Sequence, residues 1–302
     1  MKKAATGTSN GRLKPTAFHR HRARGGNRLG ATGAAAVMAC AAAAVGAEPA
    51  MHEIISPRQI GPPRVYVLAP DNIEPGKKYP ALYMLPVEAE DNAHFGNPLE
   101  EARALDLANR HQIFCVYPTF TETPWFADHP TDLKKRQESY FIQEAIPFVE
   151  ANYPVLSERS GRWLAGFSKS GWGAFSLLLR NPGLFEKAAS FDAPLMQEKV
   201  GPWGSGLIFG DQQTFDAHRP DLLFRKHAAE YRGGSPRFVL MGSVLFKKHT
   251  GDAHALMLEL GIPHLYHDVQ SRRHHWNSDW LDKAAQMLFG ANNNPALVFP
   301  KP

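Results

Sequence analysis

Short runs rich in β-branched and aromatic residues alternate along the chain with longer stretches that have helical periodicity. The short runs lie at residues 64–70, 80–86, 113–118, 161–167, 187–191, 237–243 and 264–270. Candidate helices between them span residues 98–112, 138–154, 170–182 and 252–261. Strands that alternate with helices predict an α/β fold, with a mostly parallel central sheet and helices on both faces.

This alternation fills a single predicted domain, residues 51–290. Neither a repeat, nor a low-complexity segment, nor a linker divides it. The final stretch, residues 291–302 with the sequence ANNNPALVFPKP, lacks periodicity, so we expect a loose tail there.

The first 47 residues differ in composition from the rest. They contain eight Lys and Arg residues and no acid, and their apolar, Ala-rich run extends from Ala34 to Ala47. Basic, then apolar, then small residues predict a bacterial-type signal peptide that is removed after Ala47, so that the protein is periplasmic or secreted. The alternatives are a basic tail without structure, a retained anchor, for which the run is short, and a lipoprotein signal with Cys40 as the lipidated residue.

Removal of this leader reverses the net charge. The whole chain has a net charge of +5. Without the eight basic residues of the leader, the chain keeps 26 Lys and Arg against 29 Asp and Glu, which gives a net charge of about −3. The basic pI of about 9.1 therefore comes from the leader and predicts no nucleic-acid partner. Cys115 would be the one remaining cysteine, which excludes a disulfide within the chain.

Ser168 lies where a strand is expected to turn sharply into a helix. The strand GRWLA comes just before, Gly166 stands two residues before the serine, and a helix is expected to begin near Gly171. This is the arrangement of a nucleophile elbow, which exposes the hydroxyl above the sheet at a helix N-terminus. Ser170 stands where the usual G-x-S-x-G motif has its second glycine. The other interpretation is that Ser168 only caps the helix.

A serine nucleophile needs a base, which in the α/β-hydrolase order follows the last strand. His274 and His275 come just after the strand predicted at residues 264–270. His264 and His267 within that strand point to opposite faces, so they do not share a metal ion, and packing explains them better. We expect neither a metal nor a cofactor.

Most of residues 60–290 resembles the esterase family of the α/β-hydrolase superfamily, which includes S-formylglutathione hydrolase, enterochelin esterase, secreted mycolyltransferases and feruloyl or acetyl-xylan esterases. The specific parts of the resemblance are the blocks WLAGFSKSGWGAFSLLLRNPGLFEKAASF and LGIPHLYHDVQSRRHHWNSDW. PALYMLP, PWFADHP, FIQEAIPFVEANYPV and FGD extend it. The resemblance implies an α/β-hydrolase fold and a serine esterase.

The resemblance also assigns roles to single residues. Ser168 matches the family nucleophile, and His274 matches the base because Trp276 gives the family's His-x-Trp pattern, with His275 as the alternative. The backbone N–H of Lys169 would be one oxyanion donor. We expect the Lys169 side chain to be a solvated charge.

Two departures from the family pattern concern the oxyanion site and the acid. Family members have His-Gly after the second central strand, whereas this chain has Pro86 and Val87; since proline has no N–H, Val87 or Glu88 must donate. Members also have an Asp after the strand at residues 237–243, where this chain continues with Val244, Leu245 and Phe246.

Asp192 is the predicted replacement for the acid. It follows the strand at residues 187–191, next after the elbow, and so leaves the sheet at the same edge as Ser168. Asp252, expected in a loop, is the alternative. The other interpretation is that Asp192 only stabilises its turn and Asp252 only caps a helix.

Together these residues predict a secreted serine carboxylesterase that acts on a small-molecule or polysaccharide-linked ester, with sugar and aromatic-acid esters as candidates. A cleft lined by tryptophan side chains would bind such groups by stacking. Four tryptophans are candidates for this cleft, and for each of them packing in the core is the other interpretation: Trp125, Trp203, Trp276 and Trp280. The alternatives are an acyltransferase and a non-catalytic binding protein on a decayed esterase scaffold.

Overall fold

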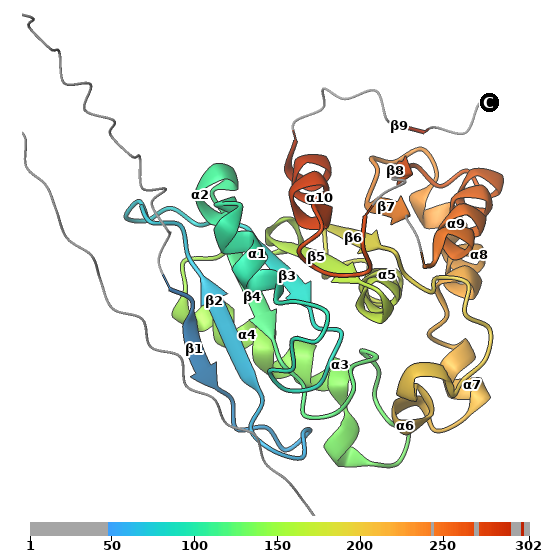
Figure 1. Cartoon of the computed structure of the whole chain (residues 1–302), viewed down its shortest axis with the longest axis horizontal. Coiled ribbons are helices and arrows are strands. Elements are labelled where there is room, and N and C mark those ends of the chain that lie inside the picture. The colour runs from blue at the N-terminus through green and yellow to red at the C-terminus, as the bar shows by residue number, and fades with distance from the viewer. Residues whose placement is uncertain (1–47, 243–244, 269–271, 291–296, 299–302) are drawn as a thin grey trace, which may run out of the picture. The chain divides into compact units, whose positions relative to one another are not determined.

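The strands form one sheet, which Figure 1 shows in the computed structural model. The structure describes residues 48–242, 245–268, 272–290 and 297–298, so the predicted leader and most of the predicted tail lie outside the described residues. The strands are β1 (Ala50–Glu53), β2 (Arg64–Leu68), β3 (Ala81–Leu85), β4 (Phe114–Pro118), β5 (Arg162–Phe167), β6 (Lys187–Phe191), β7 (Phe238–Gly242), β8 (His264–Asp268) and β9 (Leu297–Val298). All seven predicted strands are confirmed.

The sheet is parallel in its centre and antiparallel at its edges. The strand order is β1-β2-β4-β3-β5-β6-β7-β8-β9. Neighbours from β4 through β8 are parallel, whereas β1, β2 and β9 pair in the antiparallel direction. β3, β4 and β7 are buried at every position, as expected for strands covered on both faces. The predicted α/β-hydrolase arrangement is therefore confirmed.

Helices cover both faces of this sheet (Figure 1). Leu82 and Met84 of β3 pack against α1, α2 and α10, while Tyr83 and Leu85 face the core shared with α4, α5, α8 and α9. No helix in the described ranges is long and apolar enough to cross a bilayer. The helices are α1 (Pro98–Ala104), α2 (Leu107–His111), α3 (Gln137–Tyr140), α4 (Ile146–Asn152), α5 (Lys169–Arg180), α6 (Gly206–Phe209), α7 (Gln212–Asp216), α8 (Pro220–Tyr231), α9 (Lys247–Glu259) and α10 (Trp280–Phe289).

Several helical regions differ from the prediction. The helix expected over residues 98–112 breaks into α1 and α2, because Asp106 adopts a left-handed conformation with φ of 52°. Four helices have no counterpart in the predicted ranges: α6, α7, α8 and α10. α9 begins at Lys247, so Asp252 lies inside a helix rather than in the expected loop.

Helix α5 carries the elbow and lies deep in the core. Every residue from Ser170 to Leu179 is buried. Gly173 contacts the buried ring of Phe126 so closely that a Cβ atom there would overlap the ring. The missing side chain at this position is what allows α5 to approach the Phe126 ring.

We predict that Gly173→Ala lowers the free energy of unfolding by about 1–3 kcal/mol, because the added methyl group overpacks the core. Gly251→Ala is the matched control: Gly251 also lies in a helix, α9, but nothing would meet its Cβ within 4 Å. This control should gain up to about 1 kcal/mol from helix propensity. Urea denaturation of both variants measures the difference. Equal stability of the two variants would contradict this account of α5.

Candidate active site

Ser168 occupies a strained turn between β5 and α5. Its φ of 56° and ψ of −132° lie where a residue with a side chain is rarely found. The Ser168 N–H donates to the Phe191 carbonyl at 2.9 Å, which ties the turn to the end of β6. Gly166 is required because a Cβ atom there would overlap the Ser170 backbone. This is the geometry predicted for a nucleophile elbow.

Ser170, the departure from the usual motif, stabilises this turn. Its hydroxyl is fully buried, donates to the Phe167 carbonyl at 2.8 Å and accepts from the Phe167 N–H at 2.9 Å. Both ends of the Ser170 hydroxyl are therefore engaged by the backbone beside the elbow. The serine replaces the usual glycine without leaving a buried polar group unpaired.

A row of hydrogen bonds joins Ser168, His274 and Asp192. His274 Nε2 lies 3.1 Å from Ser168 Oγ, and His274 Nδ1 lies 2.7 Å from Asp192 Oδ2. A carboxylate accepts hydrogen bonds, so Asp192 favours the tautomer with the proton on Nδ1, which leaves Nε2 able to take the serine proton. The structure thus brings together the three residues that the sequence had singled out.

The Asp192 carboxylate is fully buried and has a second partner. Its Oδ1 accepts the backbone N–H of Phe246 at 2.8 Å. Phe246 follows β7, the strand after which family members were expected to carry their acid. In this chain the acid, Asp192, follows β6 instead. The segment after β7 contributes the Phe246 N–H, which donates a hydrogen bond to that acid.

The two alternative residues lie elsewhere. Asp252 is partly exposed on α9 and forms an ion pair with Lys248 at 2.6 Å. The His275 ring lies against Gly96, and its Nδ1 faces the Asn277 N–H at 3.4 Å. Neither residue contacts Ser168 through a hydrogen bond in the described part of the chain.

The residues whose backbone amides are expected to bind the oxyanion line the same hollow as the serine. Ser168, Lys169, Val87, Glu88 and His274 all line this hollow, whose volume is about 400 Å³. Within the described ranges, the N–H groups of Lys169 and Val87 donate to no other protein group. Free amides at the N-terminus of α5 offer a partial positive charge to an anion.

The side chain of Lys169 is not the solvated charge that we expected. It is half-buried in the hollow and donates a hydrogen bond to the Thr123 hydroxyl. Burial lowers the pKa of the Lys169 ammonium to about 8, while the negative charge of Glu88 acts in the opposite direction. The expectation was wrong because burial of this side chain depends on segments distant in the sequence.

Aromatic and apolar side chains form the rest of the wall. Phe95 and Phe246 each pack 5.6 Å from the His274 ring. Trp203 is 51% exposed and holds its ring 5.5 Å from Phe246. Of the tryptophans considered for a cleft, Trp203 alone lines this hollow; the others are fully buried in the core: Trp125, Trp276 and Trp280.

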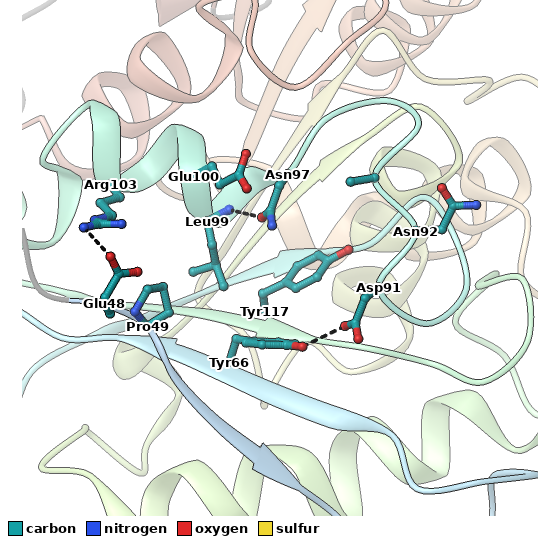
Figure 2. A pocket seen from close by; sticks show the side chains of 11 residues that line it. Glu48, Pro49, Tyr66, Asp91, Asn92, Asn97, Leu99, Glu100, Arg103 and Tyr117 are labelled. Carbon is teal, nitrogen blue, oxygen red and sulfur yellow. Dashed lines mark hydrogen bonds and ion pairs between the residues drawn. The ribbon is translucent and has the colours of Figure 1, made fainter.

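A second hollow of about 330 Å³ lies beside α1 (Figure 2). Tyr66 donates to Asp91 at 2.9 Å in its wall, and the catalytic candidates do not line it. Asn92 lines both hollows, so the two are neighbours.

One histidine of β8, His264, pairs with a neighbouring helix. His264 Nε2 lies 2.8 Å from His254 of α9, and His264 Nδ1 faces the Ile262 carbonyl at 2.8 Å. Burial lowers the pKa of His264 to about 4. Among the residues that the structure describes, no three His, Cys, Asp or Glu side chains are grouped as metal ligands would be.

A family model described as "Putative esterase" matches residues 56–235. The chain belongs to this esterase family. Esterase Rv1288 of Mycobacterium tuberculosis is 26% identical over 249 residues, 68% of this chain and 51% of that protein. S-formylglutathione hydrolase of Rattus norvegicus is 30% identical over 112 residues, 36% of either chain. The chain spans about half the length of the first of these curated relatives.

Solved structures of other proteins share the esterase fold. A ferulic acid esterase superposes with a TM-score of 0.65 at 18% identity, covering 80% of this chain and 96% of that chain. MPT51 of Mycobacterium tuberculosis superposes with a TM-score of 0.59 at 18% identity, covering 80% and 97%. At this identity the similarity establishes the fold, and the chemistry must be argued from the site itself.

We predict that Asp192→Asn lowers ester turnover by about four decades while folding is retained, because the amide favours the wrong His274 tautomer. Asp252→Asn, the control, should change turnover little, since Asp252 pairs only with exposed Lys248. Steady-state kinetics on an aryl ester, with circular dichroism to check folding, measures both. A folded, nearly fully active Asp192→Asn protein would show that the acid lies elsewhere.

Proposed function

We propose that the protein is a serine carboxylesterase that forms an acyl-enzyme on Ser168. The main support for the proposal is the hydrogen-bonded triad Asp192–His274–Ser168. Its serine has a strained backbone and lines the hollow of about 400 Å³. A serine hydroxyl becomes a useful nucleophile only when a base takes its proton, and this row provides the base and its orienting acid.

The reaction runs in two halves. Ser168 Oγ attacks the ester carbonyl while His274 Nε2 takes the hydroxyl proton, and the backbone amides of Lys169 and Val87 hold the oxyanion. His274 then gives this proton to the departing alcohol, which leaves an ester on Ser168. In the second half a water molecule attacks that ester with His274 as base, and Ser168 regains its proton as the acid product leaves.

The strain at Ser168 favours an enzyme over a binding protein on a decayed scaffold. A positive φ at a residue with a side chain costs roughly 1–3 kcal/mol and persists where the surroundings enforce it. Here the Phe191 carbonyl and the Ser170 hydroxyl fix the turn. Binding alone has no use for a strained serine beside an oriented imidazole.

We infer a sugar or aromatic-acid ester as the substrate. The half-exposed indole of Trp203 offers a flat face at the wall of the catalytic hollow, suited to an aromatic ring or a sugar. The neighbouring hollow, reached at Asn92, carries hydroxyl and carboxylate groups that sugar hydroxyls could contact (Figure 2). A small-molecule ester and an ester on a polysaccharide both fit this description.

We also propose that residues 1–47 are a leader removed on export to the periplasm or beyond. The proposal rests on the order of basic, apolar and small residues in that stretch. N-terminal sequencing of the exported protein should find a start near Glu48. Residues 1–30 on the exported protein would overturn the leader.

We predict that an organophosphonate probe labels Ser168 covalently, because an elbow serine beside a base is trapped where an ordinary serine is not. Peptide mass spectrometry should place the adduct on Ser168, and Ser168→Ala should abolish both the label and aryl-ester turnover. Ser235→Ala, which removes an exposed serine, is the control and should keep both. Label on Ser170 alone, or no label and no turnover, would overturn the proposed function.

A further inference from the structure

The backbone N–H of Lys169 holds the oxyanion in the proposed reaction, but the Lys169 side chain has no role in it. The ammonium group is half-buried beside the nucleophile, although taking a charge out of water costs free energy unless partners compensate. The desolvation free energy of a positive charge in this position must therefore be offset by groups of the protein or by a ligand.

The protein itself offsets little of this cost. An ammonium has three N–H donors, and Lys169 gives one of them to the Thr123 hydroxyl. Within the described residues, no carboxylate lies within ion-pair distance of it; Glu88 lines the same hollow, but its carboxylate accepts from the Phe95 N–H at 3.3 Å. Lys169 thus keeps donors for a further acceptor in the hollow.

Thr123 adds a second donor next to the first. Its hydroxyl oxygen accepts from Lys169, so the hydroxyl proton is available to another acceptor. The position of Thr123 is well fixed, because its carbonyl accepts from the side chain of Gln137 at 3.0 Å. Gln137 is fully buried and also accepts the backbone N–H groups of Trp125 and Phe126, at 2.8 and 3.0 Å.

We infer that Lys169 and Thr123 bind a carboxylate of the substrate, so that the protein prefers esters that carry an acid group on the acyl chain or on the alcohol. A carboxylate supplies acceptors for both donors and neutralises the half-buried charge. The Glu88 carboxylate lines the same hollow and repels such a group, so the two donors on Lys169 and Thr123 must outweigh that repulsion. This inference rests on the proposed esterase function.

The test compares two pairs of esters that differ in charge but little in shape. Mono-4-nitrophenyl adipate against 4-nitrophenyl hexanoate places the carboxylate on the acyl side. 4-Acetoxybenzoate against 4-acetoxybenzamide places it on the alcohol side. For each pair the quantity of interest is the ratio of kcat/KM for the charged ester to that for the neutral one, in the wild-type protein and in variants.

Lys169→Met keeps the backbone N–H and the length of the side chain but removes the charge. We predict that it lowers the charged-to-neutral ratio roughly tenfold or more in at least one pair, as expected for the loss of a charge-assisted hydrogen bond. Thr123→Val should lower the ratio of the same pair by a smaller factor. Lys226→Met, which removes an exposed lysine of α8, should leave both ratios unchanged.

The outcomes separate this inference from the proposed function. If neutral esters are hydrolysed but Lys169→Met leaves both ratios within about twofold of wild type, the carboxylate site is wrong and the esterase stands. A fall of charged and neutral rates by the same factor has the same meaning, since Lys169 would then act on the reaction or the fold in general. No turnover of any of the four esters would overturn the esterase and, with it, this inference.

Discussion

The hydrogen bond between Asp192 and His274 is the contact on which the proposed chemistry depends, and the sheet determines it. Asp192 leaves the carboxyl end of β6, and His274 lies on the segment between β8 and α10. The fully buried carboxylate has two partners, the His274 imidazole and the backbone N–H of Phe246 after β7. A buried carboxylate with fewer partners would lose its charge or destabilise the fold, so these segments constrain one another.

The acid leaves the sheet one strand earlier than the family resemblance predicts. Because β5, β6 and β7 are adjacent parallel strands, their carboxyl ends lie at one edge of the sheet. A carboxylate from β6 can therefore reach the same imidazole as one from β7. The Phe246 N–H donates to the acid from the segment after β7, and the rings of Phe95, Phe167 and Phe246 pack around the His274 imidazole.

Sequence reasoning was strongest where a pattern is local. The central strands are continuous apolar runs, and Gly166 before Ser168 marks a turn that no larger residue fits, so strands and elbow were both predictable. The order of strands also pointed to Asp192. The start of α9 was missed because the residue before it, Phe246, is held by a distant contact: its N–H donates to Asp192. The burial of Lys169 was missed for a similar reason: Thr123 lies 46 residues away in the chain. The break at Asp106 was also missed, although Asp is one of the residues that adopt a left-handed conformation.

Proton NMR of the His274 imidazole tests the hydrogen bond between Asp192 and His274 most directly. A proton on Nδ1 that is held by a buried carboxylate is strongly deshielded and protected from exchange, so it should resonate far downfield of the backbone amides. We expect such a resonance in the wild-type protein and in Asp252→Asn, and its loss in both His274→Ala and Asp192→Asn. A downfield resonance that persists unchanged in folded Asp192→Asn would contradict the assignment of Asp192 as the partner of His274.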